Sequence, residues 1–203
     1  MKVNQCSIEG WEEWYPEFRT FNDPQLVRMK QEAFRFGREH YRYKYASEYE
    51  PDLYRKYHPR WLTLLGSSGA GKTMLAKKLA GFVYPWPTLA KILRAQEYGR
   101  FDDICDEKIC CIDDIGSEYQ SDFVNAKLYE MFSRREGKWT IFTANLSVEQ
   151  VSAKVDPRIA SRMLRHGSVV VEVDITDFNL RSALREPTPQ PVGATTPQAS
   201  VIP

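Results

Sequence analysis

The sequence predicts an α/β protein with a parallel sheet covered by helices on both faces. Short, nearly continuous apolar segments are typical of strands buried on both sides, and they alternate here with segments of helical periodicity. A glycine-rich loop stands between the first of these strands and the helix that follows it. Regular alternation of strand and helix is the pattern that gives a parallel sheet.

The first predicted element is a helix over residues 23–45, with Asp23 as its N-cap and Pro24 at its first helical position. Apolar side chains then recur at three- and four-residue spacing, which indicates one buried helix face. These side chains are Leu26, Met29, Ala33 and Phe36. A short apolar strand is predicted at 61–66, where it ends in glycine, and a helix at about 72–82.

The second half of the chain continues the alternation. The segment KICCIDDIG at 108–116 predicts a buried strand that ends in acidic residues. The elements predicted after it are a helix at 122–135, a strand at 139–145, helices at 148–155 and 157–164, and a strand at 168–175. We therefore divide the chain into an N-terminal helical lead-in at 1–60, a core at 61–186 and a tail at 187–203. The tail has five prolines and no charged residue, which predicts disorder.

Length and charge restrict the function. The chain has 203 residues and a formal net charge of +1, which allows one domain with a buried core. Because the charge is so close to zero, contact with nucleic acid would have to come from a local patch. The sequence has no run of about 18 apolar residues and no apolar stretch after Lys2, so we expect neither a membrane span nor a secretory signal.

The four cysteines do not indicate a metal site. Cys6 stands alone, while Cys105, Cys110 and Cys111 share one segment without a neighbouring histidine, and zinc sites need paired spacings. Adjacent residues of a strand point to opposite faces of the sheet, so we expect Cys110 and Cys111 in two different parts of the core. Unpaired core cysteines favour a reducing, cytoplasmic compartment.

The segment GSSGAGKT matches the phosphate-loop pattern G-x-x-x-x-G-K-[ST] at every position, with a strand before it and a helix after it. Glycines let the backbone wrap closely around phosphates, and the N–H groups at the helix start donate to them. We expect Lys72 to reach the β- and γ-phosphates and the Thr73 hydroxyl to ligate magnesium. The predicted binding residues are Gly66, Ser67, Ser68, Gly69, Ala70, Gly71, Lys72 and Thr73. The segment therefore predicts binding of a nucleoside triphosphate with Mg²⁺.

Two acidic residues end the strand that follows, 41 residues after Lys72. Asp113 is expected to be the second partner of the magnesium ion. Asp114 is expected to face the γ-phosphate, where it could orient or deprotonate the attacking water. The alternative is a solvated turn, which is how we interpret Asp102 and Asp103.

Three further residues fit the same site. Asn145 closes the strand WTIFTAN and is expected beside the γ-phosphate. Arg158 and Arg162 lie four residues apart, on one face of a predicted helix. An arginine on a surface helix suits insertion into the site of a neighbouring subunit, where it would stabilise charge on the transferred phosphoryl group. The alternative is a solvated basic face.

The order of GSSGAGKT, ICCIDDIGSE, TIFTAN and DPRIASRM resembles the AAA+ ATPases of the DnaC-type helicase-loader group, which are close to replication initiators and IstB-type transposition helpers. The resemblance covers about residues 17–182, including the lead-in FRTF. It implies ATP as the nucleotide, ATP hydrolysis, Asn145 as sensor 1, and Arg162 as the arginine finger with Arg158 beside it. Glu118 matches a frequent family acid.

The resemblance also implies partners. Family members bind ATP between subunits of a ring or spiral, contact single-stranded DNA and deliver a replicative helicase. This chain departs from the family in the short stretch 81–107, where loaders often carry an additional helical element that grips DNA. It also has no room for a C-terminal helical lid, as is usual in this subgroup, and Arg181 is the late arginine available to replace a lid sensor.

Residues 41–61 hold six of the eleven tyrosines, interleaved with basic residues and interrupted by acidic ones. Aromatic side chains beside cations are used to bind single strands. Tyrosines also cover apolar surface or meet partner proteins. The interpretations left open are packing, nucleic acid, and a partner or the adenine side of the nucleotide.

The resulting hypothesis is a helicase-loader-like ATPase that acts in DNA replication. A transposition helper of the IstB type shares the same motifs and differs in its partner, a transposase. A nucleotide-dependent scaffold that hydrolyses ATP very slowly is a third candidate. A small-molecule kinase is disfavoured, because it would leave the TAN strand end and the serine–arginine segment unexplained.

Overall fold

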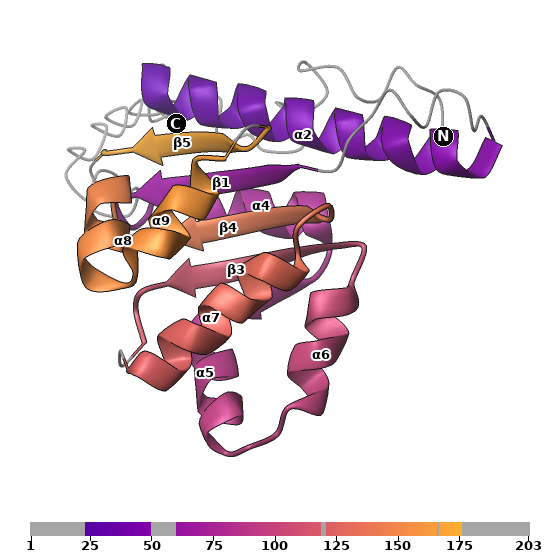
Figure 1. Ribbon diagram of the computed structural model, residues 1–203. Coiled ribbons are helices and arrows are strands. Elements are labelled where there is room, and N and C mark those ends of the chain that lie inside the picture. Colours follow the sequence, from indigo (N-terminus) through magenta and orange to yellow (C-terminus); the bar gives the residue numbers. More distant parts are fainter. Residues whose placement is uncertain (1–22, 50–59, 119–120, 166, 176–203) are drawn as a thin grey trace, which may run out of the picture.

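The computed structural model describes residues 23–49, 60–118, 121–165 and 167–175. These residues form a five-stranded sheet in the order β2-β3-β4-β1-β5, in which every neighbouring pair is parallel (Figure 1). The strands are β1 (Trp61–Gly66), β2 (Val83–Pro85), β3 (Ile109–Ile115), β4 (Trp139–Ala144) and β5 (Val169–Val173). The predicted α/β class with a parallel sheet is therefore confirmed.

Helices cover both faces of the sheet and divide the core in two. The helices are α2 (Pro24–Tyr49), α4 (Lys72–Ala80), α5 (Trp86–Arg94), α6 (Gly99–Asp106), α7 (Asp122–Arg134), α8 (Val148–Lys154) and α9 (Pro157–Met163). On one face α2 and α4 bury their apolar sides, including the predicted row from Leu26 to Phe36. On the other face α5, α6, α7, α8 and α9 pack around Trp86, Phe132 and Phe142.

Cys105, Cys110 and Cys111 lie in the core as predicted. Cys110 belongs to the part of the core under α5 and α7, whereas Cys111 belongs to the part under α2 and α4. Cys105, on α6, is buried as well. Burial raises the pKa of the Cys105 thiol to about 11 and that of Cys110 to about 12, so both stay protonated at neutral pH.

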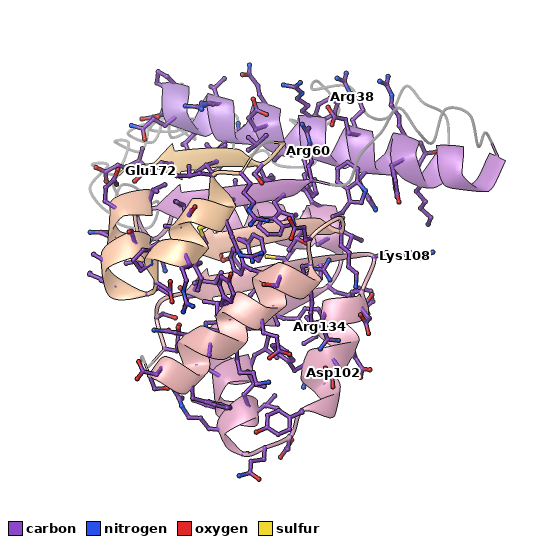
Figure 2. The ribbon with its side chains drawn as sticks, viewed as in Figure 1. Arg38, Arg60, Asp102, Lys108, Arg134 and Glu172 are labelled. Carbon is purple, nitrogen blue, oxygen red and sulfur yellow. The ribbon has the colours of Figure 1, made fainter. Side chains whose placement is uncertain are left out.

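The stretch 81–107 departs from the sequence interpretation, which assigned it no element. It contains β2 at the sheet edge and the helices α5 and α6. Asp102 and Asp103, interpreted as a solvated turn, lie within α6, and Asp102 pairs with Arg134 of α7 (Figure 2). The sequence does carry a helical pattern here, because Trp86, Leu89, Ala90 and Leu93 recur at three- and four-residue spacing and are buried in α5. The strand β2 has three residues and is too short to show a strand pattern.

Arg135 fixes the end of α7 against the sheet. Its guanidinium is fully buried and donates to the carbonyls of Ile104, Glu107 and Trp139 and to the Thr140 hydroxyl. Burial lowers the pKa of Arg135, and these acceptors compensate the buried charge. The helix α7 is thus held firmly beside β4.

Several sequence predictions fall outside the described residues. They are the lead-in FRTF, Cys6, Arg181, the tail at 187–203 and the tyrosine-rich residues 50–59. Among the residues that are described, no helix is both long enough and apolar enough to cross a membrane.

Candidate functional site

The phosphate-loop segment lies at the carboxyl edge of the sheet, between the end of β1 and the start of α4. Gly66, Gly69 and Gly71 have positive φ angles of 106°, 72° and 85°, a region that other residues rarely adopt. A Cβ on Gly66 would lie 2.0 Å from the carbonyl oxygen of Val173, so glycine is required there for steric reasons too. The loop therefore needs its glycines to curve between β1 and α4.

Lys72 extends back from the first turn of α4 into this loop. Its Nζ donates to the carbonyl oxygens of Gly66 at 2.9 Å and Ser67 at 2.7 Å, and to Oδ1 of Asn145 at 2.9 Å. All three acceptors are neutral, and Lys72 forms no ion pair with a carboxylate in the described part of the chain. Burial lowers the pKa of Lys72 to about 8, while Asp114 and Asp113 oppose the shift. A buried ammonium with neutral partners is complementary to an anion such as a phosphate.

Thr73 and Asp113 meet beside Lys72. The Thr73 hydroxyl donates to Oδ1 of Asp113 at 2.7 Å, and the Thr143 hydroxyl donates to the same oxygen at 2.6 Å. A hydroxyl and a carboxylate are suitable ligands for Mg²⁺, which usually takes only one or two protein carboxylates and completes its shell with water and phosphate oxygens. The described residues include no group of three or more His, Cys, Asp or Glu side chains that could hold a metal alone. The pair thus fits Mg²⁺ that is shared with a phosphate.

Asp114 is held in a strained conformation at the end of β3. Its φ of 61° lies in the left-handed region, which costs a non-glycine residue about 1–3 kcal/mol. Its N–H donates to the Thr143 hydroxyl, and its carboxylate accepts from Asn145 Nδ2 at 2.9 Å and from Ser117 Oγ at 2.7 Å. Asn145 therefore bridges Lys72 and Asp114. The structure brings together Lys72 and Thr73 of α4, Asp113 and Asp114 of β3, and Asn145 directly after β4.

Two residues of this network were missed from the sequence. Thr143 orients both Asp113 and Asp114, and its position two residues before Asn145 in a buried strand was the available signal. Ser117 holds Asp114 and gave no signal beyond its nearness in sequence. Glu118, which matches a frequent family acid, accepts the N–H of Gly116 at 2.8 Å and so supports the same turn.

Arg158 and Arg162 contact another part of their own chain, on α7. The Arg162 guanidinium donates to the Tyr129 hydroxyl at 2.9 Å, and its Cζ lies 4.4 Å from the centre of the tyrosine ring. Arg158 lies 4.7 Å from the same centre and is bound to Asp156, the N-cap of α9. No hydrogen bond or ion pair joins either arginine to the phosphate loop of its own chain, and their action on a neighbouring subunit stays a prediction.

No family model matches the sequence, and no curated protein matches it significantly. The fold, in contrast, matches solved structures. The crystal structure of DnaI aligns with a TM-score of 0.57 at 23% identity, over 75% of this chain and 86% of DnaI. The chain therefore has the same fold as DnaI. Domain III of the replication initiation protein DnaA from Thermotoga maritima aligns with a TM-score of 0.51 at 17% identity, over 82% of this chain and 70% of that one.

Proposed function

We propose that this AAA+ chain is a Mg²⁺-dependent ATPase that resembles the DnaC-type helicase loaders and acts in DNA replication. The observation that carries the proposal is the buried Lys72 ammonium inside a complete phosphate loop, where its acceptors among the described residues are all neutral. The Thr73–Asp113 pair and the Asp114–Asn145 pair on either side of Lys72 support it, because they supply groups for a metal ion and for a water molecule.

Each residue has a distinct task in this proposal. Lys72 binds the β- and γ-phosphates with its ammonium, and the loop N–H groups bind the remaining oxygens. Thr73 and Asp113 would hold Mg²⁺, which neutralises charge on the phosphates when it is bound. Asp114 accepts a proton from the attacking water or orients it, and Asn145 keeps Asp114 in place. The hydrogen bonds that now join these side chains have to be exchanged for bonds to the nucleotide.

The pH dependence of nucleotide binding tests the role of Lys72. Because its pKa is about 8, Lys72 is charged below that pH and loses its proton above it. ATP affinity is expected to fall as pH rises through 8, by up to about tenfold per unit, since the neutral amine attracts phosphate weakly. The Lys72→Arg variant stays charged and should lose this fall, whatever its absolute affinity. Isothermal titration of the wild type between pH 7 and 9.5 measures the effect, and a constant affinity would exclude Lys72 as the phosphate ligand.

Deprotonation of Lys72 has opposite effects on ATP affinity, which falls, and on the free energy of unfolding, which rises. In the unfolded chain Lys72 has its ordinary pKa of 10.5, so between pH 8 and 10.5 the unfolded state binds more protons than the folded state. The contribution of Lys72 to the free energy of unfolding therefore increases as pH rises through this window. Deprotonation of Lys72 therefore does not lower ATP affinity above pH 8 by destabilising the folded state.

The partner distinguishes the helicase loader from its alternatives. We propose that subunits assemble around ATP and deliver a hexameric replicative helicase. Co-purification with such a helicase, in the presence of a non-hydrolysable ATP analogue, would favour loading, and co-purification with a transposase would favour the IstB-like helper. Tight ATP binding with almost no turnover would instead favour the nucleotide-dependent scaffold.

We propose that any contact with single-stranded DNA lies on the outer face of α2. Among the α2 side chains that the structure describes, at residues 24–44, the exposed ones include no Asp or Glu. They do include Arg28, Arg35, Arg38 and Arg42, over about 21 Å of helix. Figure 2 shows Arg38 on the side of α2 away from the sheet. In the tyrosine-rich segment, Tyr43 packs on Trp139, whereas Tyr41 is exposed beside these arginines and is free to stack on a base.

The double variant Arg38→Ser/Arg42→Ser tests this surface. Affinity for a single-stranded oligonucleotide should fall, and the slope of log affinity against log salt should decrease by about 1.4, because each phosphate contact contributes about 0.7. The matched control is Arg100→Ser/Lys154→Ser, which removes the same charge from exposed positions on α6 and α8. Equal losses in both variants, measured by fluorescence anisotropy, would indicate that net charge alone is responsible.

A further inference from the structure

The side chain of Arg162 is fixed to its own subunit by two residues around α7. Tyr129 accepts a hydrogen bond from Nη2 of Arg162 and places its ring against the guanidinium. Glu136, just beyond the end of α7, lies 3.7 Å from Nη1 through its Oε2 and also pairs with Arg165. The hydrogen bond from Arg162 holds the pKa of the Tyr129 hydroxyl below its ordinary value. The guanidinium thus has contacts on its edge and on its face.

In this position the N–H groups of Arg162 that would bind a phosphate are not accessible. The Arg162 side chain is only 13% exposed, whereas that of Arg158 is 63% exposed. Nη1 of Arg162 is buried and has no hydrogen-bond acceptor among the described residues, and Nη2 is already used by Tyr129. A phosphate that approached from another subunit would also meet the Glu136 carboxylate, which repels it.

Movement of the backbone does not easily remove this obstruction. Tyr129 lies on α7, whose end is anchored by the buried hydrogen bonds of Arg135. Arg162 lies on α9, whose first turn is capped by Asp156. The simplest way to free the guanidinium is rotation of the Arg162 side chain away from Tyr129 and Glu136.

We propose that Tyr129 is a positioning residue that, with Glu136, holds Arg162 against its own subunit until a neighbouring subunit with bound nucleotide draws it away. This inference rests on the proposed function, in which Arg162 acts on the ATP of a neighbour. Each assembly step then has to break the hydrogen bond to Tyr129 and the ion pair to Glu136. The two residues consequently raise the protein concentration at which turnover begins.

The variants Tyr129→Phe and Glu136→Gln each remove one contact and keep the shape of the side chain. Mg²⁺-ATP turnover per chain is measured across a range of protein concentrations. In each variant the concentration for half-maximal turnover should decrease by roughly three- to tenfold, as expected when one hydrogen bond or ion pair no longer competes. Tyr98→Phe and Glu97→Gln make the same chemical changes at a site away from Arg162 and should behave as the wild type.

A second comparison separates positioning from a general effect on the fold. Adding Arg162→Ala to Tyr129→Phe should abolish the gain, because Tyr129 acts only through Arg162. Wild-type behaviour of Tyr129→Phe and Glu136→Gln, or a higher half-maximal concentration, would overturn the inference while the proposed function stands, provided that Arg162→Ala alone impairs turnover. If Arg162→Ala turns over ATP as the wild type does, the role of Arg162 between subunits fails, and this inference fails with it.

Discussion

Replacement of Lys72 by alanine is expected to abolish Mg²⁺-ATP turnover. The substitution removes the only ammonium of the phosphate loop, and a hydrogen bond from a charged donor contributes about 1.5–3 kcal/mol, so ATP affinity should also fall about tenfold to a hundredfold. The Lys72 side chain also donates hydrogen bonds to Gly66, Ser67 and Asn145, and the substitution removes these bonds from the loop. Phosphate release and equilibrium binding of ATP measure the two effects.

Lys77→Ala is the matched control for this variant. Lys77 lies on the same helix α4 but is exposed, and its replacement should leave turnover and affinity unchanged. Wild-type turnover in folded Lys72→Ala protein would show that the phosphate loop is not the site of hydrolysis.

The second large effect is expected at Arg162. An arginine that stabilises the transferred phosphoryl group contributes about 10³- to 10⁵-fold to turnover, so Arg162→Ala should lose on the order of a thousandfold or more. Binding of ATP should persist, because Arg162 does not contact the phosphate loop of its own chain. Arg165→Ala is the control, since Arg165 is an exposed neighbour that shares the partner Glu136.

Mixing inactive subunits tests whether Arg162 acts on a neighbour. In a mixture of Arg162→Ala and Lys72→Ala chains, an active site forms where an intact phosphate loop faces an intact Arg162. With equal amounts and random assembly, about a quarter of the interfaces qualify, so about a quarter of the wild-type turnover should return. A mixture as inactive as its components would contradict action between subunits.

The sequence was most informative where residues close together in the chain form one structure. The spacing of Gly66, Gly71 and Lys72 predicted the loop between β1 and α4, because a phosphate loop is a local backbone shape. The alternation of Cys110 and Cys111 predicted their two different environments, since neighbouring strand residues point to opposite faces. The apolar row on α2 predicted its buried face in the same way.

The sequence was least informative where the structure depends on distant contacts. Thr143 orients Asp113 and Asp114 across two strands, and Tyr129 meets Arg162 across 33 residues, pairings that no local spacing encodes. The strand β2 is defined by its pairing with β3 rather than by its own three residues. The left-handed conformation of Asp114 likewise follows from its bonds to Asn145 and Ser117, and its residue type alone would not predict it.

Titration of the purified chain with Mg²⁺-ATP tests the central claim most directly. The buried ammonium of Lys72, set in a loop shaped by Gly66, Gly69 and Gly71, predicts one saturable site per chain that requires Mg²⁺ and is weakened in Lys72→Ala. If the titration heats of folded wild-type protein do not saturate at millimolar ATP, or if Lys72→Ala binds ATP equally well, the central claim is contradicted.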